Sequence, residues 1–154
     1  MSKEPRWLSK VAVRAIHEKL LAEHGGARGV LDDGILESAL AAPRNRYLYE
    51  RSDIFRLAAT YAHAITRDHP FGDGNKRVAL TLAGVFLELN GYQLTASEGE
   101  AVSAMVALVE RRLDEEAFAA WLEANSARPR TRVRGRQAPA PRRPRAKKRS
   151  TEEG

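Results

Sequence analysis

One short segment of the chain, HPFGDGNKR at residues 69–77, combines the residue types that phosphate chemistry needs. Gly72 and Gly74 allow the backbone to turn tightly and to approach a ligand closely. An apolar helix is expected to begin near Gly74, and the free N–H groups of a helix's first turn attract anions. Lys76 and Arg77 add two cations beside those N–H groups. The segment therefore predicts a phosphate-binding turn at a helix N-terminus.

Two further side chains of the segment could act on a bound phosphate. Asp73 offers a carboxylate, which is the kind of oxygen ligand that Mg²⁺ prefers, and His69 could accept a proton near neutral pH. A purely structural interpretation makes the segment an ordinary turn, with Asp73 or Asn75 as a helix cap. However, a cation at a helix N-terminus opposes the helix dipole by about 0.3–1 kcal/mol. A bound anion would explain why this chain has cations there.

The elements that position the segment are predicted to be helical throughout. The expected helices begin at capping residues or glycine and end at glycine, proline or asparagine. Their approximate ranges are 9–23, 32–43, 52–69, 74–90, 97–109 and 114–122. The second helix is expected to end at Pro43, because proline interrupts helical hydrogen bonding. Only Tyr92–Thr95 resembles a strand.

The fourth predicted helix is apolar on all sides, which is typical of a helix at the centre of a bundle. The predicted fold is therefore an all-α, compact six-helix bundle around a central buried helix. Residues 127–154 differ sharply, with eleven Lys or Arg and two Glu, a net charge of +9. Since the whole chain carries +6, residues 1–126 carry −3. We predict a folded domain at 1–126 and a disordered Arg/Lys/Pro-rich tail at 127–154.

Composition also limits the compartment and the chemistry. The chain of 154 residues has no cysteine, which excludes disulfides and thiolate metal sites. No apolar run is long enough to span a bilayer, and the first residues do not resemble a secretory signal. The expected location is the cytoplasm, without membrane contact.

The segment at residues 69–77 resembles the HxFx(D/E)GN(K/G)R signature of Fic/Doc proteins, which is a specific pattern. Three other runs resemble the death-on-curing branch of that family: residues 17–43, 49–65 and 85–92. The resemblance covers roughly residues 7–125 and leaves out the basic tail. It implies the Fic/Doc bundle fold and a transferase that uses ATP with Mg²⁺.

The resemblance also implies a role for each residue of the motif. His69 matches the general base that deprotonates the target hydroxyl, and Asp73 matches the Mg²⁺ ligand. Phe71 matches the apolar residue buried beneath the loop. The phosphate-binding turn corresponds to Gly74, Asn75, Lys76 and Arg77.

Two positions bear on which group is transferred. Fic proteins that transfer AMP resemble HxFx(D/E)GNGRxxR, whereas this chain has Lys76 in place of glycine and Leu80 in place of arginine. Both departures favour the death-on-curing branch, for which the resemblance implies transfer of the terminal phosphate, that is, protein kinase chemistry. Gly74 leaves the alternative, AMP transfer, open, since kinase-type members can have alanine there.

The resemblance further implies a toxin of a type II toxin–antitoxin system. The substrate is expected to be a Ser or Thr hydroxyl of a translation factor such as elongation factor Tu. The chain has no match to the inhibitory (S/T)xxxE(G/N) segment of many Fic proteins. Restraint is therefore expected from an antitoxin in trans, as a helix bound in a groove beside the site.

Other interpretations remain open at this stage. The tail could make a weak, non-specific electrostatic contact with RNA or DNA, which would suit a non-catalytic nucleic-acid or ribosome-binding module. A metal cluster could form from His63, Asp68, His69 and Asp73, although their spacing suits one helix face poorly. We expect His17 and His24 to be solvent-facing or helix-end residues, and Glu37 to lie on a solvated helix face.

Overall fold

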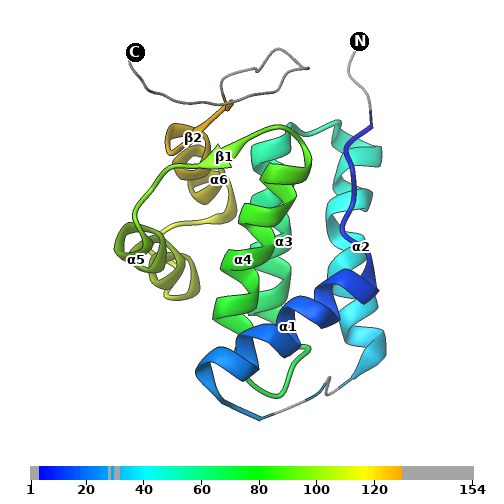
Figure 1. The fold of residues 1–154 in the computed structure, drawn as a ribbon. Coiled ribbons are helices and arrows are strands. Elements are labelled where there is room, and N and C mark those ends of the chain that lie inside the picture. The colour runs from blue at the N-terminus through cyan, green and yellow to red at the C-terminus, as the bar shows by residue number, and fades with distance from the viewer. Residues whose placement is uncertain (1–3, 28, 30–31, 130–154) are drawn as a thin grey trace, which may run out of the picture.

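The computed structural model describes residues 4–27, 29 and 32–129, and these form a helical bundle (Figure 1). The described residues contain six α-helices and one pair of two-residue strands, which confirms the all-α prediction. In chain order the elements are α1 (Lys10–His24), α2 (Asp33–Glu50), α3 (Ile54–Asp68), α4 (Asn75–Leu89), β1 (Gln93–Leu94), α5 (Glu98–Val109), α6 (Glu115–Ala124) and β2 (Ser126–Ala127).

Five of these six helices begin at a side chain that caps free backbone N–H groups. The capping residues are Ser9, Asp32, Asp53, Ser97 and Asp114. Ser97 and Glu100 form the predicted capping box, in which each side chain accepts a hydrogen bond from the other residue's backbone. Local sequence therefore fixes most of the helix starts.

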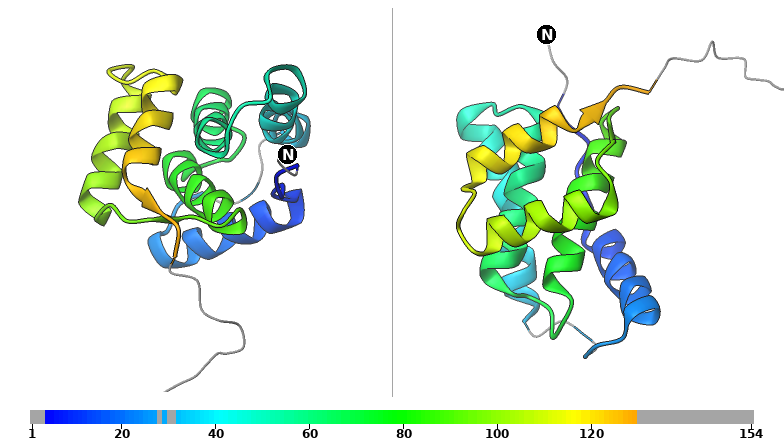
Figure 2. Two further views of the ribbon diagram at one scale, coloured as in Figure 1. Left: turned by 90° about the horizontal axis from the view of Figure 1, so that it is seen from above. Right: turned by 90° about the vertical axis from the view of Figure 1, so that its left-hand side faces the viewer.

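The centre of the bundle is shared by α3 and α4, which lie side by side (Figure 2). Nine residues of α3 are buried, against six of α4. The prediction of a buried helix at residues 74–90 is confirmed, and α3 joins it as the more deeply buried of the two. Because α3 leads directly into the loop before α4, the core holds both sides of that loop.

The predicted end of the second helix at Pro43 is wrong. Pro43 lies inside α2, which continues to Glu50 and ends at Arg51 in the left-handed conformation with φ 50°. Proline removes one helical hydrogen bond, but here Pro43 is buried and Tyr47, one turn later, packs against the core. Apolar packing on both sides of the proline favours continuing the helix.

A half-buried carboxylate at the start of α6 ties this helix to α2 and α3. Glu115 accepts hydrogen bonds from the Thr60 hydroxyl and from Arg56 Nε, and Arg46 Nε lies 3.2 Å from its carboxylate. Burial raises the pKa of Glu115, but the hydrogen bonds from Thr60 and Arg56 and the charge of Arg46 outweigh it. The pKa is therefore held below its ordinary value.

The two short strands close the end of the bundle that lies opposite the α3–α4 loop (Figure 1). Gln93 pairs with Ala127 and Leu94 with Ser126, in antiparallel register. Arg128 then stacks over the ring of Tyr92. The structure thus describes the chain to Pro129, slightly beyond the predicted domain boundary at residue 126. Residues 130–154 of the predicted tail lie outside the described residues.

None of the described helices is both long enough and apolar enough to cross a membrane.

Candidate phosphate-binding site

The candidate site is the loop between α3 and α4, and its first residue has an unusual backbone. His69 caps the C-terminus of α3 in the left-handed conformation, with φ 51°. Such a conformation is uncommon for a residue other than glycine and occurs often at functional sites. The imidazole is exposed, whereas Pro70 and Phe71 are buried. The turn therefore anchors the loop in the core while leaving His69 at the surface.

Asn75 holds the loop closed. Its side-chain oxygen accepts a hydrogen bond from the backbone N–H of Phe71, and its amide nitrogen donates to the Phe71 carbonyl, both at 3.2 Å. The Asn75 side chain is thus occupied within the protein. Only the backbone N–H of Asn75 is left to meet a phosphate, so its contribution to binding would come through the main chain.

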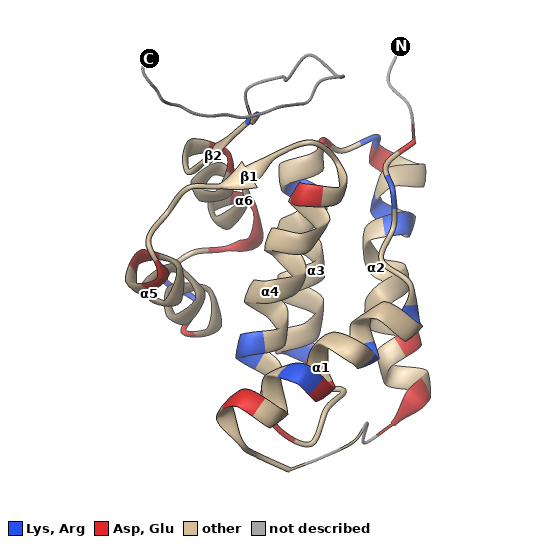
Figure 3. Cartoon of the chain, in the orientation of Figure 1, with Lys and Arg blue, Asp and Glu red and all other residues tan. Residues whose placement is uncertain are grey.

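The N-terminus of α4 differs from the five other described helices because no side chain caps it. Gly74 stands at the cap position with φ 81°, a conformation that favours glycine, and the first turn contains no acidic residue. Lys76 and Arg77 are exposed at this end, where Figure 3 shows basic residues on the ribbon. Arg77 turns back toward the helix start: its Nη1 lies 3.9 Å from where a Cβ on Gly74 would stand. The helix start and two cations thus present positive potential at one place.

Asp73 lies at the tip of the loop with its carboxylate exposed. Its Oδ1 accepts the N–H of Gly74 at 2.8 Å, and no ion pair of this carboxylate with a Lys or Arg is found among the described residues. Mg²⁺ in nucleotide sites is commonly held by one or two carboxylates together with phosphates and water. One carboxylate beside a phosphate-binding turn fits that pattern.

The described residues contain no group of three or more His, Asp or Glu side chains that could hold a metal ion. His63 lines a separate hollow with Thr60 and Glu115, and Asp68 is paired with Arg67. The interpretation of residues 63–73 as a metal cluster is therefore not supported.

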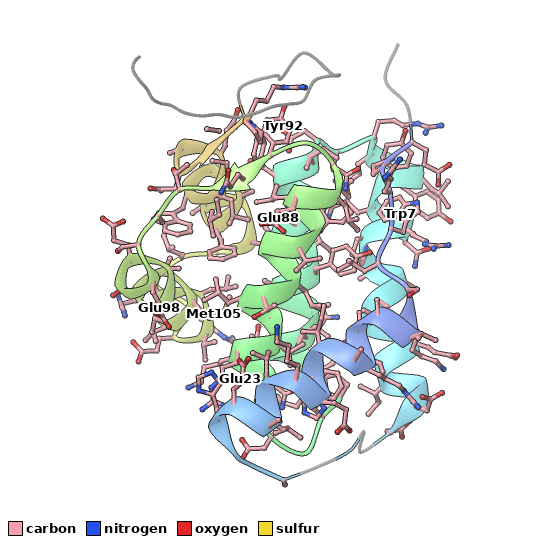
Figure 4. All side chains as sticks on the ribbon, viewed as in Figure 1. Trp7, Glu23, Glu88, Tyr92, Glu98 and Met105 are labelled. Atoms are coloured by element: carbon pink, nitrogen blue, oxygen red, sulfur yellow. The ribbon has the colours of Figure 1, made fainter. Side chains whose placement is uncertain are left out.

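A pocket of about 540 Å³ opens over the loop and contains every predicted site residue. One side is polar and is formed by His69, Gly72, Asp73, Gly74, Asn75, Lys76 and Arg77. The other side is apolar and comes mainly from α5, through Val102, Met105 and Val106, with Leu80 of α4. In Figure 4, Met105 lies between α5 and α4. The sequence did not predict this apolar wall, because nothing in the motif indicates which distant helix faces it.

The structure also corrects the expectation for His17. This residue of α1 is buried, with 2% of its surface exposed, and its Nε2 lies 3.0 Å from the backbone oxygen of Asp73. Its ring stacks on that of Phe71, with centroids 4.0 Å apart. His24 is exposed at the end of α1, as expected, and Glu37 pairs with Lys10 on an exposed face. His17 is thus a site-supporting residue that sequence reasoning missed.

Comparison with known proteins agrees with this geometry. Residues 7–87 match the Fic/DOC family, and the chain belongs to that family. It is 38% identical over 90 residues to "Protein kinase doc" of Escherichia phage P1, covering 58% of this chain and 71% of that protein. It is also 38% identical over 76 residues to "Toxin Doc" of Mycolicibacterium smegmatis, covering 47% of this chain and 57% of that protein. The predicted resemblance to the Doc branch is therefore confirmed.

Proposed function

We propose that this protein is a Doc-type toxin with protein kinase activity, which transfers the terminal phosphate of ATP to a Ser or Thr hydroxyl of another protein. The observation that carries the proposal is the single pocket that joins an exposed imidazole, His69, to an uncapped helix N-terminus with two cations. A base and a phosphate cradle are the two parts that such a transfer needs. The name "Protein kinase doc" of the phage relative supports the same reaction class.

The two parts divide the work of the reaction. His69 would accept the hydroxyl proton on its imidazole as the hydroxyl oxygen bonds to the terminal phosphorus. The bond from that phosphorus to the bridging oxygen of ADP breaks, and ADP carries the electron pair away. Positioning the hydroxyl and its base is expected to contribute about 10²–10⁴ in rate.

The phosphate groups are expected to rest against the start of α4. The backbone N–H groups there, with Lys76 and Arg77, would stabilise the negative charge that shifts during the transfer. Asp73 is the residue that would hold Mg²⁺, which supplies further charge neutralisation between phosphates when bound. The Asn75 side chain keeps the loop in shape through Phe71.

Two residues favour phosphate over AMP transfer. Lys76, in the first turn of α4, lines the pocket, and its side chain would compete for space with an additional phosphate group. Leu80, one turn later, makes this part of the wall apolar, where the AMP-transferring pattern has arginine. AMP transfer remains the second candidate because Gly74, rather than alanine, begins the helix.

The decisive experiment uses two preparations of ATP, one labelled on the terminal phosphate and the other on the α-phosphate. A cell lysate is incubated with the protein and each preparation, and labelled proteins are identified by mass spectrometry. Label from the terminal phosphate alone supports the kinase, and label from the α-phosphate supports AMP transfer. His69→Ala should abolish the labelling, while His24→Ala, which changes an exposed histidine outside the pocket, should not. Labelling that survives His69→Ala would contradict the proposed base.

The target and the regulator are the finer parts of the proposal. A translation factor such as elongation factor Tu is the proposed substrate, and the reaction would take place in the cytoplasm. Restraint would come from an antitoxin helix bound beside the site, and the exposed side of α5 supports this: Val102, in the pocket wall, is 48% exposed. Toxicity of the chain that no neighbouring gene product relieves would argue against this antitoxin.

A further inference from the structure

We infer that His17 is a positioning residue that fixes Asp73, the proposed Mg²⁺ ligand, from the N-terminal helix α1. The inference depends on the proposed function in one respect, namely that Asp73 holds the metal. His17 belongs to α1 and Asp73 to the α3–α4 loop, 56 residues later. In Figure 1, α1 crosses the bundle at the end where that loop lies.

The hydrogen bond between the two residues has a defined direction. His17 Nε2 lies 3.0 Å from the Asp73 backbone oxygen, and a carbonyl oxygen can only accept. His17 Nε2 must therefore carry a proton and donate it. Because His17 is almost fully buried, water cannot easily take the place of its imidazole, so losing this donor would weaken the hold on the partly buried Asp73 carbonyl.

Aromatic packing fixes the imidazole ring from a second direction. The rings of His17 and Phe71 stack with an interplanar angle of 22°, and Phe71 is 1% exposed. The backbone of Phe71 is in turn held by the Asn75 side chain. His17 thus joins the loop to α4 through a continuous set of contacts, and the loop residues on both sides of Asp73 are glycines, which by themselves restrict the backbone little.

The segment that follows α1 lies beside the Asp73 carboxylate. Gly26, just after α1, has φ 125°, and a Cβ built on it would lie 2.8 Å from Asp73 Oδ2. The N–H of Gly72 also donates to the Gly29 carbonyl at 3.1 Å. The loop is therefore hydrogen-bonded on its backbone by His17 and Gly29, while Gly26 lies close beside the carboxylate with no room for a side chain between them. Such an arrangement sets where the carboxylate can stand.

The first experiment measures nucleotide affinity with Mg²⁺ and with EDTA, using ATP and the full chain. His17→Phe keeps an aromatic ring on Phe71 but removes the donor, whereas His17→Gln keeps an N–H donor at a similar reach. We expect the metal-dependent gain in affinity to fall about three- to tenfold in His17→Phe, the factor that one hydrogen bond contributes. It should be largely restored in His17→Gln, and affinity in EDTA should be unchanged in both.

The measurement separates positioning from general damage. A melting temperature that drops together with affinity in both Mg²⁺ and EDTA would reduce His17 to a core residue and overturn the inference. Equal metal dependence in wild type and His17→Phe would overturn it as well. If the wild-type protein bound ATP equally well with Mg²⁺ and with EDTA, the proposed metal role of Asp73 and with it the proposed function would fail. That result is distinguishable from a failure of the inference about His17 alone.

Two further tests do not require substitution of His17. Nitrogen NMR of the histidines should find His17 protonated at Nε2, and a bare Nε2 would overturn the inference. Gly25 and Gly26 provide a matched pair, since both have positive φ but only a Cβ on Gly26 meets Asp73. Gly26→Ala should lose metal-dependent affinity while Gly25→Ala keeps it, although both substitutions strain the backbone. Equal losses would contradict a specific contact with the carboxylate.

Discussion

The start of α4 carries cations, whereas the first turn of a helix normally favours acidic residues. Replacing one of these cations with an acidic residue should therefore raise the stability of the protein and lower its affinity for ATP. We consider Lys76→Glu. Lys76 is exposed in the first turn of α4, and no side chain caps that turn. Removing a cation and adding an anion there each contribute about 0.3–1 kcal/mol through the helix dipole. Repulsion from the exposed Asp73 offsets part of this gain, by up to about 0.5 kcal/mol.

Together these ranges give a net stabilisation of about 0.1–2 kcal/mol, with a central value near 1 kcal/mol. For a folded part of this size, the entropy of unfolding converts 1 kcal/mol into about 4 °C. The melting temperature of Lys76→Glu should therefore rise at low ionic strength, by about 4 °C at the central value. Because salt screens the dipole effect, most of that rise should disappear in about 1 M NaCl. Affinity for ATP should fall by about tenfold or more, since a charge-assisted contact is lost.

The assay is thermal unfolding followed by circular dichroism at both salt concentrations, together with direct titration of ATP. Lys76→Gln should show about half the stabilisation. Lys19→Gln, which removes an exposed lysine from the middle of α1, should leave both melting temperature and affinity nearly unchanged. If Lys76→Glu lowered the melting temperature at low salt, the start of α4 could not be an uncompensated positive site. The reasoning about the phosphate cradle would then be refuted.

Three other outcomes are expected. Because the pKa of Glu115 is lowered in the folded state, its contribution to stability is complete above the ordinary pKa of glutamate and is lost as the pH falls through the lowered value. The free energy of unfolding should accordingly fall less steeply with decreasing pH in Glu115→Gln than in the wild type. Identical dependence of the unfolding free energy on pH in the two proteins would contradict this. Phe71→Ala should destabilise the protein by about 3–5 kcal/mol in chemical denaturation, since the ring is fully buried; a loss below about 1 kcal/mol would show that the ring is not packed as described. Truncation after Pro129 removes ten Lys or Arg and should abolish binding to RNA. In the full chain, the logarithm of the RNA-binding constant should fall with the logarithm of the salt concentration, with a slope no steeper than about −7. If residues 1–129 still bound RNA, the tail would not be the source of the binding.

Local sequence signals predicted the helix starts well because a helix start is fixed by capping between residues close together in the sequence. Ser97 and Glu100 are three residues apart and cap the same turn, so their pattern is sufficient. Pro43 misled for the opposite reason. Its cost to the helix is local, but the burial that outweighs it depends on contacts with other parts of the chain, which a single sequence does not display.

The candidate site divides in the same way. His69, Asp73 and the turn that follows lie within nine residues, and their grouping in one pocket follows from chain continuity. His17 and the apolar wall around Met105 come from helices far away in the sequence. His17 also lacked a distinctive signal, because a single histidine on a helix is common. Only the packing of α1 across the loop reveals its contact with Asp73.

The crossing of α1 over the α3–α4 loop has a practical consequence for dissecting the protein. A fragment beginning at Asp32 would contain every residue of the signature, yet it would lack both His17 and Gly26. Such a fragment should be an incomplete receptor for nucleotide, and a separate peptide spanning residues 4–27 could restore it by complementation. If each piece were fused to a different protein, association of those two proteins would bring the pieces together. The recovered affinity for nucleotide would then report that association.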